Sequence, residues 1–212
     1  MDLMRAQYTN MIFLKNKTTP LATQVAEVLL KDGQDLSQTE VWIPTAGAGR
    51  RIRKALAEKG VLSPRFTQPM RALLPEGLRI AQRFEREGAW ALALKRVDSV
   101  FLEPLFSEAK LDSDASRLKS GGVLCDLCDL LAEAALRPSD TIVADVCGED
   151  AERWRVLGSL YQCYLAALKD GVLTDPNEAR FTELAKPSQA AKLRRLVIAC
   201  IPDLTLLAQR YA

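Results

Sequence analysis

The sequence predicts an α/β protein with a mostly parallel, open sheet and a long helical insertion. Three observations predict it. Short apolar runs alternate with helical patterns near the amino terminus, no convincing strand occurs between residues 78 and 137, and a β-branched run returns near the carboxyl end. We therefore expect residues 1–76 and 190–212 to form the sheet layer, and residues 77–189 to be a helical insertion within the same structural unit.

The predicted strands of the amino-terminal part are three short apolar segments, at residues 11–14, 41–43 and 65–67. Helical periodicity separates them over residues 21–29 and 50–59, so that strands and helices alternate. Connections of this length favour right-handed crossovers between parallel strands. A last strand is predicted within residues 193–201, beside the first two, and a short final helix follows Pro202–Leu204.

The insertion is predicted from apolar residues at helical spacing. Its helices are expected at residues 78–84, 90–105, 123–136, 141–146, 149–169 and from Asp175–Pro176 onward. Pro104 and the Gly121–Gly122 pair are expected to interrupt helices. The helix at 149–169 has the clearest period, and its Trp154, Tyr161 and Tyr164 are expected to pack in a core rather than to stack on bases.

Composition limits the possible functions. Hydrophobic residues make up 48% and charged residues 26%, enough for a packed core, and the formal net charge is +2. The chain has no histidine, which excludes the usual general base and the commonest metal ligand. Five cysteines, an odd number, are expected to be reduced and mostly buried in a cytoplasmic protein. No signal peptide and no membrane-spanning run are recognised, and any nucleic-acid binding requires a local basic patch.

One segment, Thr45-Ala-Gly-Ala-Gly-Arg50, lies where a phosphate would bind in an α/β fold. It follows a predicted strand and precedes a predicted helix, so we expect a tight loop whose backbone N–H groups face outward. It lacks the Gly-Lys-Ser/Thr of a Walker A motif and the third glycine of the dinucleotide-binding fingerprint. A structural turn and an anion-binding loop therefore both stay open.

The helix predicted after this loop carries a run of cations. Arg50, Arg53 and Lys54 share a face at i, i+3 and i+4, with Arg51 beside them. Such a face is able to neutralise phosphates, although a solvated surface is the alternative and Glu58 dilutes the charge. The candidate phosphate-binding or nucleic-acid-binding residues are Thr45, Gly47, Gly49, Arg50, Arg51, Arg53 and Lys54.

Two other patterns favour structural roles. Cys125-Asp-Leu-Cys128 has the spacing of half a zinc site, but no second pair and no histidine complete it, so both thiols are expected in a core. Asp145, Glu149, Asp150 and Glu152 lie around a predicted helix start, where carboxylates stabilise the helix dipole, and a two-metal site is the alternative. We therefore assign no catalytic residue, no metal and no cofactor, and enzymatic activity is not expected of this chain alone.

Several sequence segments are informative because of the order in which they follow one another along the chain. Val41–Leu56, with Pro-Thr and Arg-Arg after a strand, is followed by Leu62–Thr67 and Met70–Pro75. Trp154–Asp175 has Leu-x-x-x-Tyr spacing, and Leu196–Leu204 is an apolar run that ends in Pro-Asp-Leu. From about residue 10 to its end, the chain thereby resembles the N-terminal region of the B subunit of bacterial AddAB-type helicase–nucleases, which are PD-(D/E)XK nuclease-family proteins of double-strand-break repair.

The resemblance implies a degenerate P-loop-helicase-like domain without a functional ATP site. It implies contact with single-stranded DNA and with an AddA-type helicase subunit, as DNA-backbone contact or as a scaffold in DNA repair and recombination. Members of the family are longer and carry their nuclease motif near the carboxyl end, so the chain is expected to be a fragment without nuclease activity. Two other hypotheses stay open: a nucleotide- or anion-binding domain that uses the Thr45–Arg50 loop, and a protein-interaction module.

Overall fold

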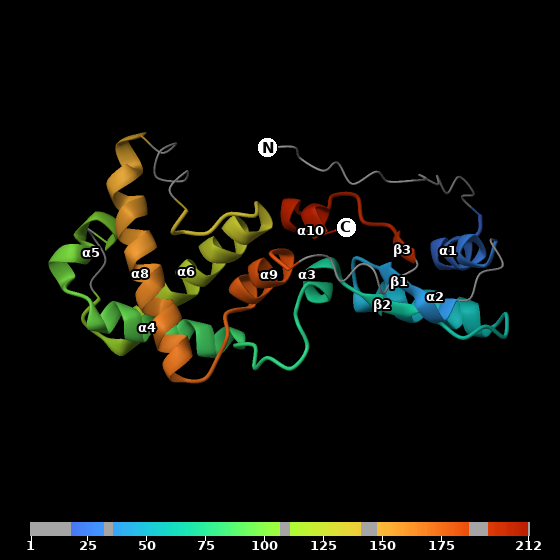
Figure 1. Ribbon diagram of the computed structural model, residues 1–212, viewed down its shortest axis with the longest axis horizontal. Helices are drawn as coiled ribbons and strands as arrows, with labels where there is room; N and C mark the ends of the chain where they lie inside the picture. Colours follow the sequence, from blue (N-terminus) through green and yellow to red (C-terminus); the bar gives the residue numbers. More distant parts are fainter. Residues whose placement is uncertain (1–17, 32–35, 107–110, 141–147, 187–194, 212) are drawn as a thin grey trace. The chain divides into compact units, whose positions relative to one another are not determined.

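The protein, described here by a computed structural model, divides into two compact units (Figure 1). Unit 1 comprises Met1–Leu73 and Leu184–Ala212, and unit 2 comprises Leu74–Glu183. The residues that the structure describes are 18–31, 36–106, 111–140, 148–186 and 195–211. The strand predicted at residues 11–14 and the helix predicted at 141–146 lie outside them.

A small parallel sheet forms the centre of unit 1. Its strands are β1 (Thr39–Trp42), β2 (Arg65–Thr67) and β3 (Arg195–Ile198). Their order is β2-β1-β3, and β1 pairs in parallel with both neighbours, so that Val41 lies opposite Phe66 and Val197. The prediction of a mixed α/β chain with a parallel sheet is confirmed, with the last strand placed beside β1.

Helices pack on both faces of β1. The helical elements of unit 1 are α1 (Leu21–Leu30), η1 (Leu36–Gln38), α2 (Ala46–Ala57), α3 (Pro69–Ala72) and α10 (Leu206–Tyr211). Val41 and Ile43 belong to a core shared with α1 and α2. On the opposite face Trp42, which is 1% exposed, stacks on Tyr211 of α10 with ring centroids 6.0 Å apart. Burial on both faces explains why the run Val41–Ile43, which begins within β1, is apolar without alternation.

Unit 2 is helical. Its elements are α4 (Arg83–Arg96), α5 (Ser99–Phe106), α6 (Asp114–Glu133), η2 (Gly148–Asp150), α8 (Ala151–Asp170) and α9 (Pro176–Leu184). In Figure 1, α8 crosses α4, and both helices contribute to one core. Trp90 of α4 stacks on Tyr164 of α8 with centroids 4.3 Å apart, and Tyr161 is also buried. The prediction that the aromatic residues of α8 pack in a core is confirmed, and Trp154 packs against its edge.

The first two helices predicted in the insertion were wrong in their limits. Residues 78–81 are not helical: Ile80 forms an isolated parallel bridge with Thr174, and the Ala81 N–H donates to the Thr174 carbonyl at 2.9 Å. The apolar residues after Trp90 belong to two helices instead of one. The division lies at Asp98, whose carboxylate accepts the Val100 N–H at 2.9 Å and so starts α5, whereas Pro104 lies inside α5.

The break predicted at Gly121–Gly122 was also wrong, because both glycines lie inside α6. The reason is close packing between helices. A Cβ atom on Gly121 would lie 2.8 Å from the Glu87 carbonyl oxygen and 3.1 Å from the Trp90 Cβ, both on α4. A Cβ atom on Gly122 would only make ordinary contacts, at 3.6 Å, with the side chains of Arg83 and Glu87.

We expect the two glycines to respond in opposite directions to alanine. Gly121→Ala should destabilise the protein by about 1–3 kcal/mol, since a backbone carbonyl cannot move aside as a side chain does. Gly122→Ala should stabilise it by up to about 1 kcal/mol through helix propensity. Urea-induced unfolding followed by circular dichroism measures both. Equal stabilisation by the two variants would contradict the close approach of α4 and α6.

Candidate functional site

The predicted loop at Thr45–Gly49 is instead the first turn of α2, which begins at Ala46. The Thr45 hydroxyl accepts the Ala48 N–H at 3.2 Å and caps the helix, an interaction worth about 1 kcal/mol. Gly49 is buried because the helix approaches the sheet: a Cβ there would lie 2.5 Å from the Ile43 side chain. Gly49 is therefore packed closely against the side chain of Ile43 in the unit 1 core.

The cations of α2 lie on its solvent side. Gly49, Ile52, Ala55 and Leu56 are buried, and the four predicted basic residues, Arg50, Arg51, Arg53 and Lys54, are all exposed. None of these four forms an ion pair with any carboxylate that the structure describes. The structure thus brings them together as one basic surface, which we call the α2 basic face.

The members of this face differ in where their side chains reach. Arg50 folds back over the first turn, with its Nη2 atom 4.0 Å from the position of a Cβ on Gly47. Arg53 extends toward β2, where its Nε donates to the Ser63 hydroxyl at 3.2 Å and its guanidinium lies 5.5 Å from the centre of the Phe66 ring. Arg50 therefore shares the helix N-terminus with Thr45, and Arg53 does not.

Sequence reasoning missed Gln68, which joins the ends of two strands. Its side-chain N–H donates to the Pro44 carbonyl at 3.1 Å, so the segments that follow β1 and β2 meet at the carboxyl edge of the sheet. Both strands lead from this edge into helices, α2 and α3. The Gln68-Pro69 pair, with proline at the first helical position, was the available signal.

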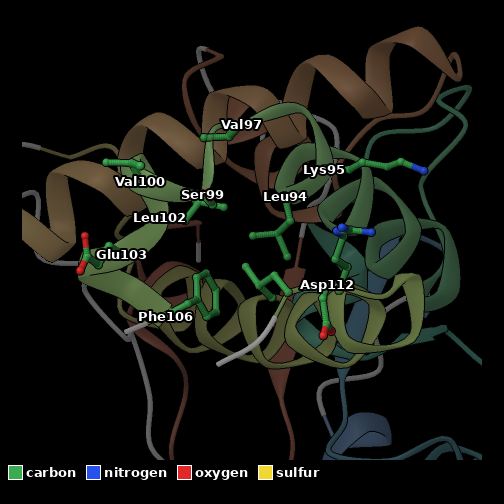
Figure 2. Close-up of a pocket in the computed structure, with 11 residues that line it drawn as sticks. Leu94, Lys95, Val97, Ser99, Val100, Leu102, Glu103, Phe106 and Asp112 are labelled. Carbon is green, nitrogen blue, oxygen red and sulfur yellow. The ribbon is translucent and has the colours of Figure 1, made fainter. Parts of the chain in front are cut away.

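Unit 2 contains an apolar groove that sequence reasoning did not find (Figure 2). It lies where the end of α4, α5 and the residues before α6 meet, and its volume is about 730 Å³. Leu94 and Leu102 are buried in its wall, and Figure 2 shows Leu94 and Phe106 pointing into it. An apolar helical pattern predicts a buried face, and it does not distinguish a closed core from an open groove.

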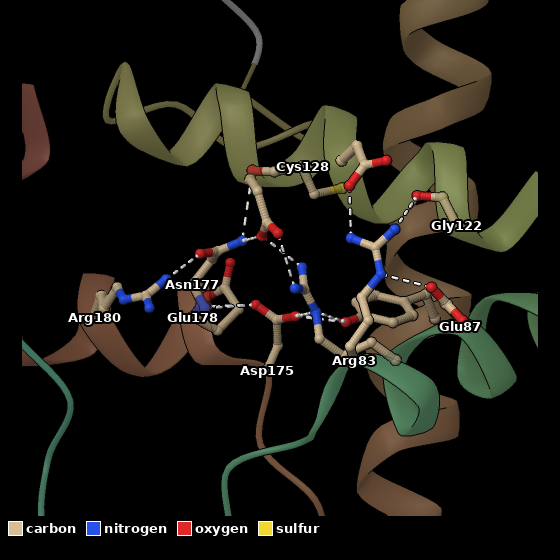
Figure 3. Close-up of polar contacts among 12 residues, drawn as sticks. Arg83, Glu87, Gly122, Cys128, Asp175, Asn177, Glu178 and Arg180 are labelled. Carbon is tan, nitrogen blue, oxygen red and sulfur yellow. Dashed lines mark hydrogen bonds and ion pairs between the residues drawn. The ribbon is translucent and has the colours of Figure 1, made fainter. Parts of the chain in front are cut away.

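A buried ion-pair network lies between the helices of unit 2 (Figure 3). Arg86 of α4 is 6% exposed and donates two hydrogen bonds to Asp129 of α6, at 3.0 and 2.7 Å. Its Nε lies 3.3 Å from the buried Asp175 carboxylate, which also accepts the Tyr164 hydroxyl. Asn177 donates to Asp129 at 2.7 Å. Each carboxylate is already hydrogen-bonded by cationic or neutral donors, so the network joins α4, α6, α8 and the start of α9.

The Cys125 and Cys128 thiols are also structural. Both are buried in the unit 2 core, as predicted. Burial raises the pKa of Cys125 to about 11 and raises the pKa of Cys128 further, so both remain protonated at neutral pH. In the part of the chain that the structure describes, no three His, Cys, Asp or Glu side chains are grouped to bind a metal. Over the same residues, no helix has the length and apolar character needed to cross a bilayer.

The predicted acidic cluster at the start of α8 is also satisfied locally. Asp150 and Glu152 are exposed and pair with Arg153 and Arg155 on the same helical turn, and Asp145 lies outside the described residues.

Comparisons of the chain with protein-family models, with curated proteins and with solved structures found no match. The geometry above and the sequence segments are therefore the observations that bear on function.

We expect Asp129→Asn to lower stability in a pH-dependent way. Burial disfavours the charged form of Asp129, but hydrogen bonds from Arg86 and Asn177 outweigh it and hold its pKa below the ordinary value. The ionised carboxylate therefore stabilises the fold above about pH 4, and this contribution is lost as the pH falls through the lowered pKa. At neutral pH the variant should lose about 1–3 kcal/mol, less than for a fully buried pair because the Asp129 side chain is 41% exposed.

Urea unfolding of both proteins between neutral pH and about pH 3 tests this, with Asp126→Asn as the control. Asp126 pairs with Arg83 one turn before Asp129 on the same helix, but in solvent. Its removal should have a much smaller effect. A loss of stability that stays constant down to the lowest pH would show that Asp129 acts through packing and not through its charge.

Proposed function

We propose that the chain is a non-catalytic, helicase-like domain of a DNA-repair helicase–nuclease, and that the α2 basic face contacts the phosphate backbone of single-stranded DNA. The observation that carries this proposal is that Arg50, Arg51, Arg53 and Lys54 lie close together on one exposed helix face without ion-pair partners among the described residues. Cations held together without counter-charges repel one another, and a polyanion relieves that repulsion.

The arginines of unit 2, unlike those of the α2 basic face, have carboxylate partners among the described residues. Eight of them form ion pairs within the unit: Arg79, Arg83, Arg86, Arg96, Arg117, Arg137, Arg153 and Arg155. The same side chain is thus neutralised in one unit and left open on α2.

The charges of the whole sequence are divided in the same way. Unit 1 contains 16 Lys and Arg and 7 Asp and Glu, a formal charge of +9. Unit 2 contains 13 Lys and Arg and 20 Asp and Glu, a formal charge of −7. The nearly balanced total of +2 therefore conceals a basic sheet unit and an acidic helical unit. Attraction for DNA is expected to be confined to unit 1.

The position of α2 agrees with ligand binding in other parallel sheets. Ligands of open α/β sheets bind at the carboxyl ends of the strands, where the chain leaves in different directions from a central strand. Here β1 is the central strand, and α2 starts at its carboxyl end. A phosphate at this point would meet the first backbone N–H groups of α2 and the guanidinium of Arg50. Such contacts hold a DNA strand in position without chemistry, in a chain that has no histidine.

The rest of the proposal depends on the resemblance to AddB-type subunits. It supplies the P-loop-helicase-like relationship, the role in DNA repair and recombination, and an AddA-type helicase subunit as the partner. The absence of a Walker A motif after the first predicted strand supports an inactive nucleotide site. The parallel three-stranded sheet with helices on both faces is compatible with this relationship, although it occurs in many other proteins.

We expect the chain to bind labelled single-stranded DNA, measured by fluorescence anisotropy, with an affinity that falls steeply between about 50 and 200 mM salt. The double variant Arg50→Glu with Lys54→Glu should weaken binding at least about tenfold. A plot of the logarithm of the affinity against the logarithm of the salt concentration should also become less steep, by about 0.7 for each phosphate that the variant no longer neutralises. Both side chains are exposed, so the fold should be preserved.

The matched control reverses two exposed lysines of unit 2, Lys119→Glu with Lys169→Glu, and changes the net charge equally. This control should bind DNA as the unchanged chain does. Equal weakening by both double variants would mean that only total charge matters, and the α2 basic face would lose its role. Binding of ATP that is abolished by the α2 double variant, without DNA binding, would favour the anion-binding hypothesis instead.

A further inference from the structure

The apolar groove of unit 2 is open to solvent along α5. Leu102 is buried, but Val100 is 74% exposed and Phe101 is 42% exposed on the same short helix. The groove between α5, the end of α4 and the residues before α6 thus has an apolar wall and an apolar rim. Exposed apolar side chains beside a concave surface indicate a binding site, because isolated domains rarely leave such area in water without a partner.

The cations around the groove have an ion-pair partner, and its carboxylates have none among the described residues. Its two cations, Lys95 and Arg117, are both close to Asp114, at 3.7 and 2.8 Å. Its two carboxylates, Glu103 and Asp112, form no ion pair with a residue that the structure describes. Figure 2 shows both at the periphery of the groove, on opposite sides. The rim therefore presents available negative charge, in a unit whose formal charge is −7.

We propose that this groove binds an amphipathic helix of a partner protein, with apolar residues at i, i+3 or i+4 and i+7, and with Lys or Arg beside them. The apolar residues would enter beside Leu94 and Phe106, and the basic residues would pair with Glu103 and Asp112. The acidic rim disfavours nucleic acid and anionic lipid. It also disfavours the helices of a second copy's unit 2, which carries the same negative charge. The groove shares no residue with the α2 basic face, so the two proposals are tested independently.

A synthetic helical peptide of Leu and Lys, with Leu on one face, is the probe, and its binding to the full chain is measured by fluorescence anisotropy. Val100→Asp should weaken binding at least about tenfold, because the charge is placed at the apolar rim. Glu103→Lys should weaken it about three- to tenfold and reduce its salt dependence, since one of the two rim carboxylates is reversed. Both residues are exposed, so these variants should fold as the unchanged chain does.

Two matched variants test whether the groove is the site. Leu130→Asp changes an apolar residue that is 64% exposed on α6, and Glu133→Lys reverses an exposed glutamate of the same helix; neither lines the groove. Both should bind the peptide normally. The proposal is overturned if they weaken binding as much as the groove variants, or if Val100→Asp has no effect. It is also overturned if sedimentation shows a dimer that Val100→Asp dissociates, because the occupant would then be a second copy.

Discussion

The buried guanidinium of Arg86 is the constraint on which the helical unit depends. Removing a charge from water costs several kcal/mol unless partners surround it, and these partners must come from elsewhere in the chain. Asp129 comes from α6, Tyr164 from α8, and Asp175 from the residue before α9. Asp175 also caps α9 by accepting the Asn177 and Glu178 N–H groups, at 2.7 and 3.1 Å. One cation thereby fixes four helices relative to one another, and the aromatic stack of Trp90 on Tyr164 lies beside it.

This use of charge explains the contrast between the two units. In unit 2, the buried Arg86 guanidinium acts as a structural donor whose desolvation is offset by carboxylates, while arginines such as Arg153 and Arg155 form exposed pairs. In unit 1, the fold depends on burial of β1 on both faces, and of the α2 arginines only Arg53 is described in contact with β2. Arg50, Arg51 and Lys54 form no ion pair with a described residue and are exposed to a ligand. A surface whose charges are not required for folding is free to serve binding.

Much of the fold could be predicted from the sequence because its signals are local. The apolar run Val41–Ile43, the 3.6-residue period of α8 and the Asp-Pro start of α9 correspond to elements that are present. Some of the errors come from tertiary contact, whereas the division at Asp98 and the start of α2 after Thr45 depend on local capping interactions. Gly121 looks like a turn residue, but a backbone carbonyl of α4 passes too close for a Cβ atom, and Gly49 packs against the Ile43 side chain. Nothing local distinguishes these two uses of glycine.

The candidate sites, like the fold, could be predicted from the sequence only in part. The α2 basic face could be predicted, because four cations at helical spacing are visible in the sequence, but its lack of ion-pair partners among the described residues could not. Arg86 and Arg50 are both arginines on helices, and only the distances to Asp129 and Asp175 show that one is used internally. The groove at α5 was missed for a related reason, since an apolar pattern gives the orientation of a helix face and not whether another element covers it.

The protonation states of several described side chains bear on the two binding proposals. Catalysis requires groups whose protonation changes near neutral pH or that are activated by a neighbour. Here the buried thiols are protonated, the Asp129 carboxylate is held ionised, and the Thr45 hydroxyl is occupied as a helix cap. Among the described residues, the proposed binding surfaces instead carry fixed charge: cations on α2 and carboxylates beside an apolar groove. In the two proposals, fixed charges of opposite sign on the two units would select different partners, an anionic polymer for unit 1 and a basic amphipathic helix for unit 2.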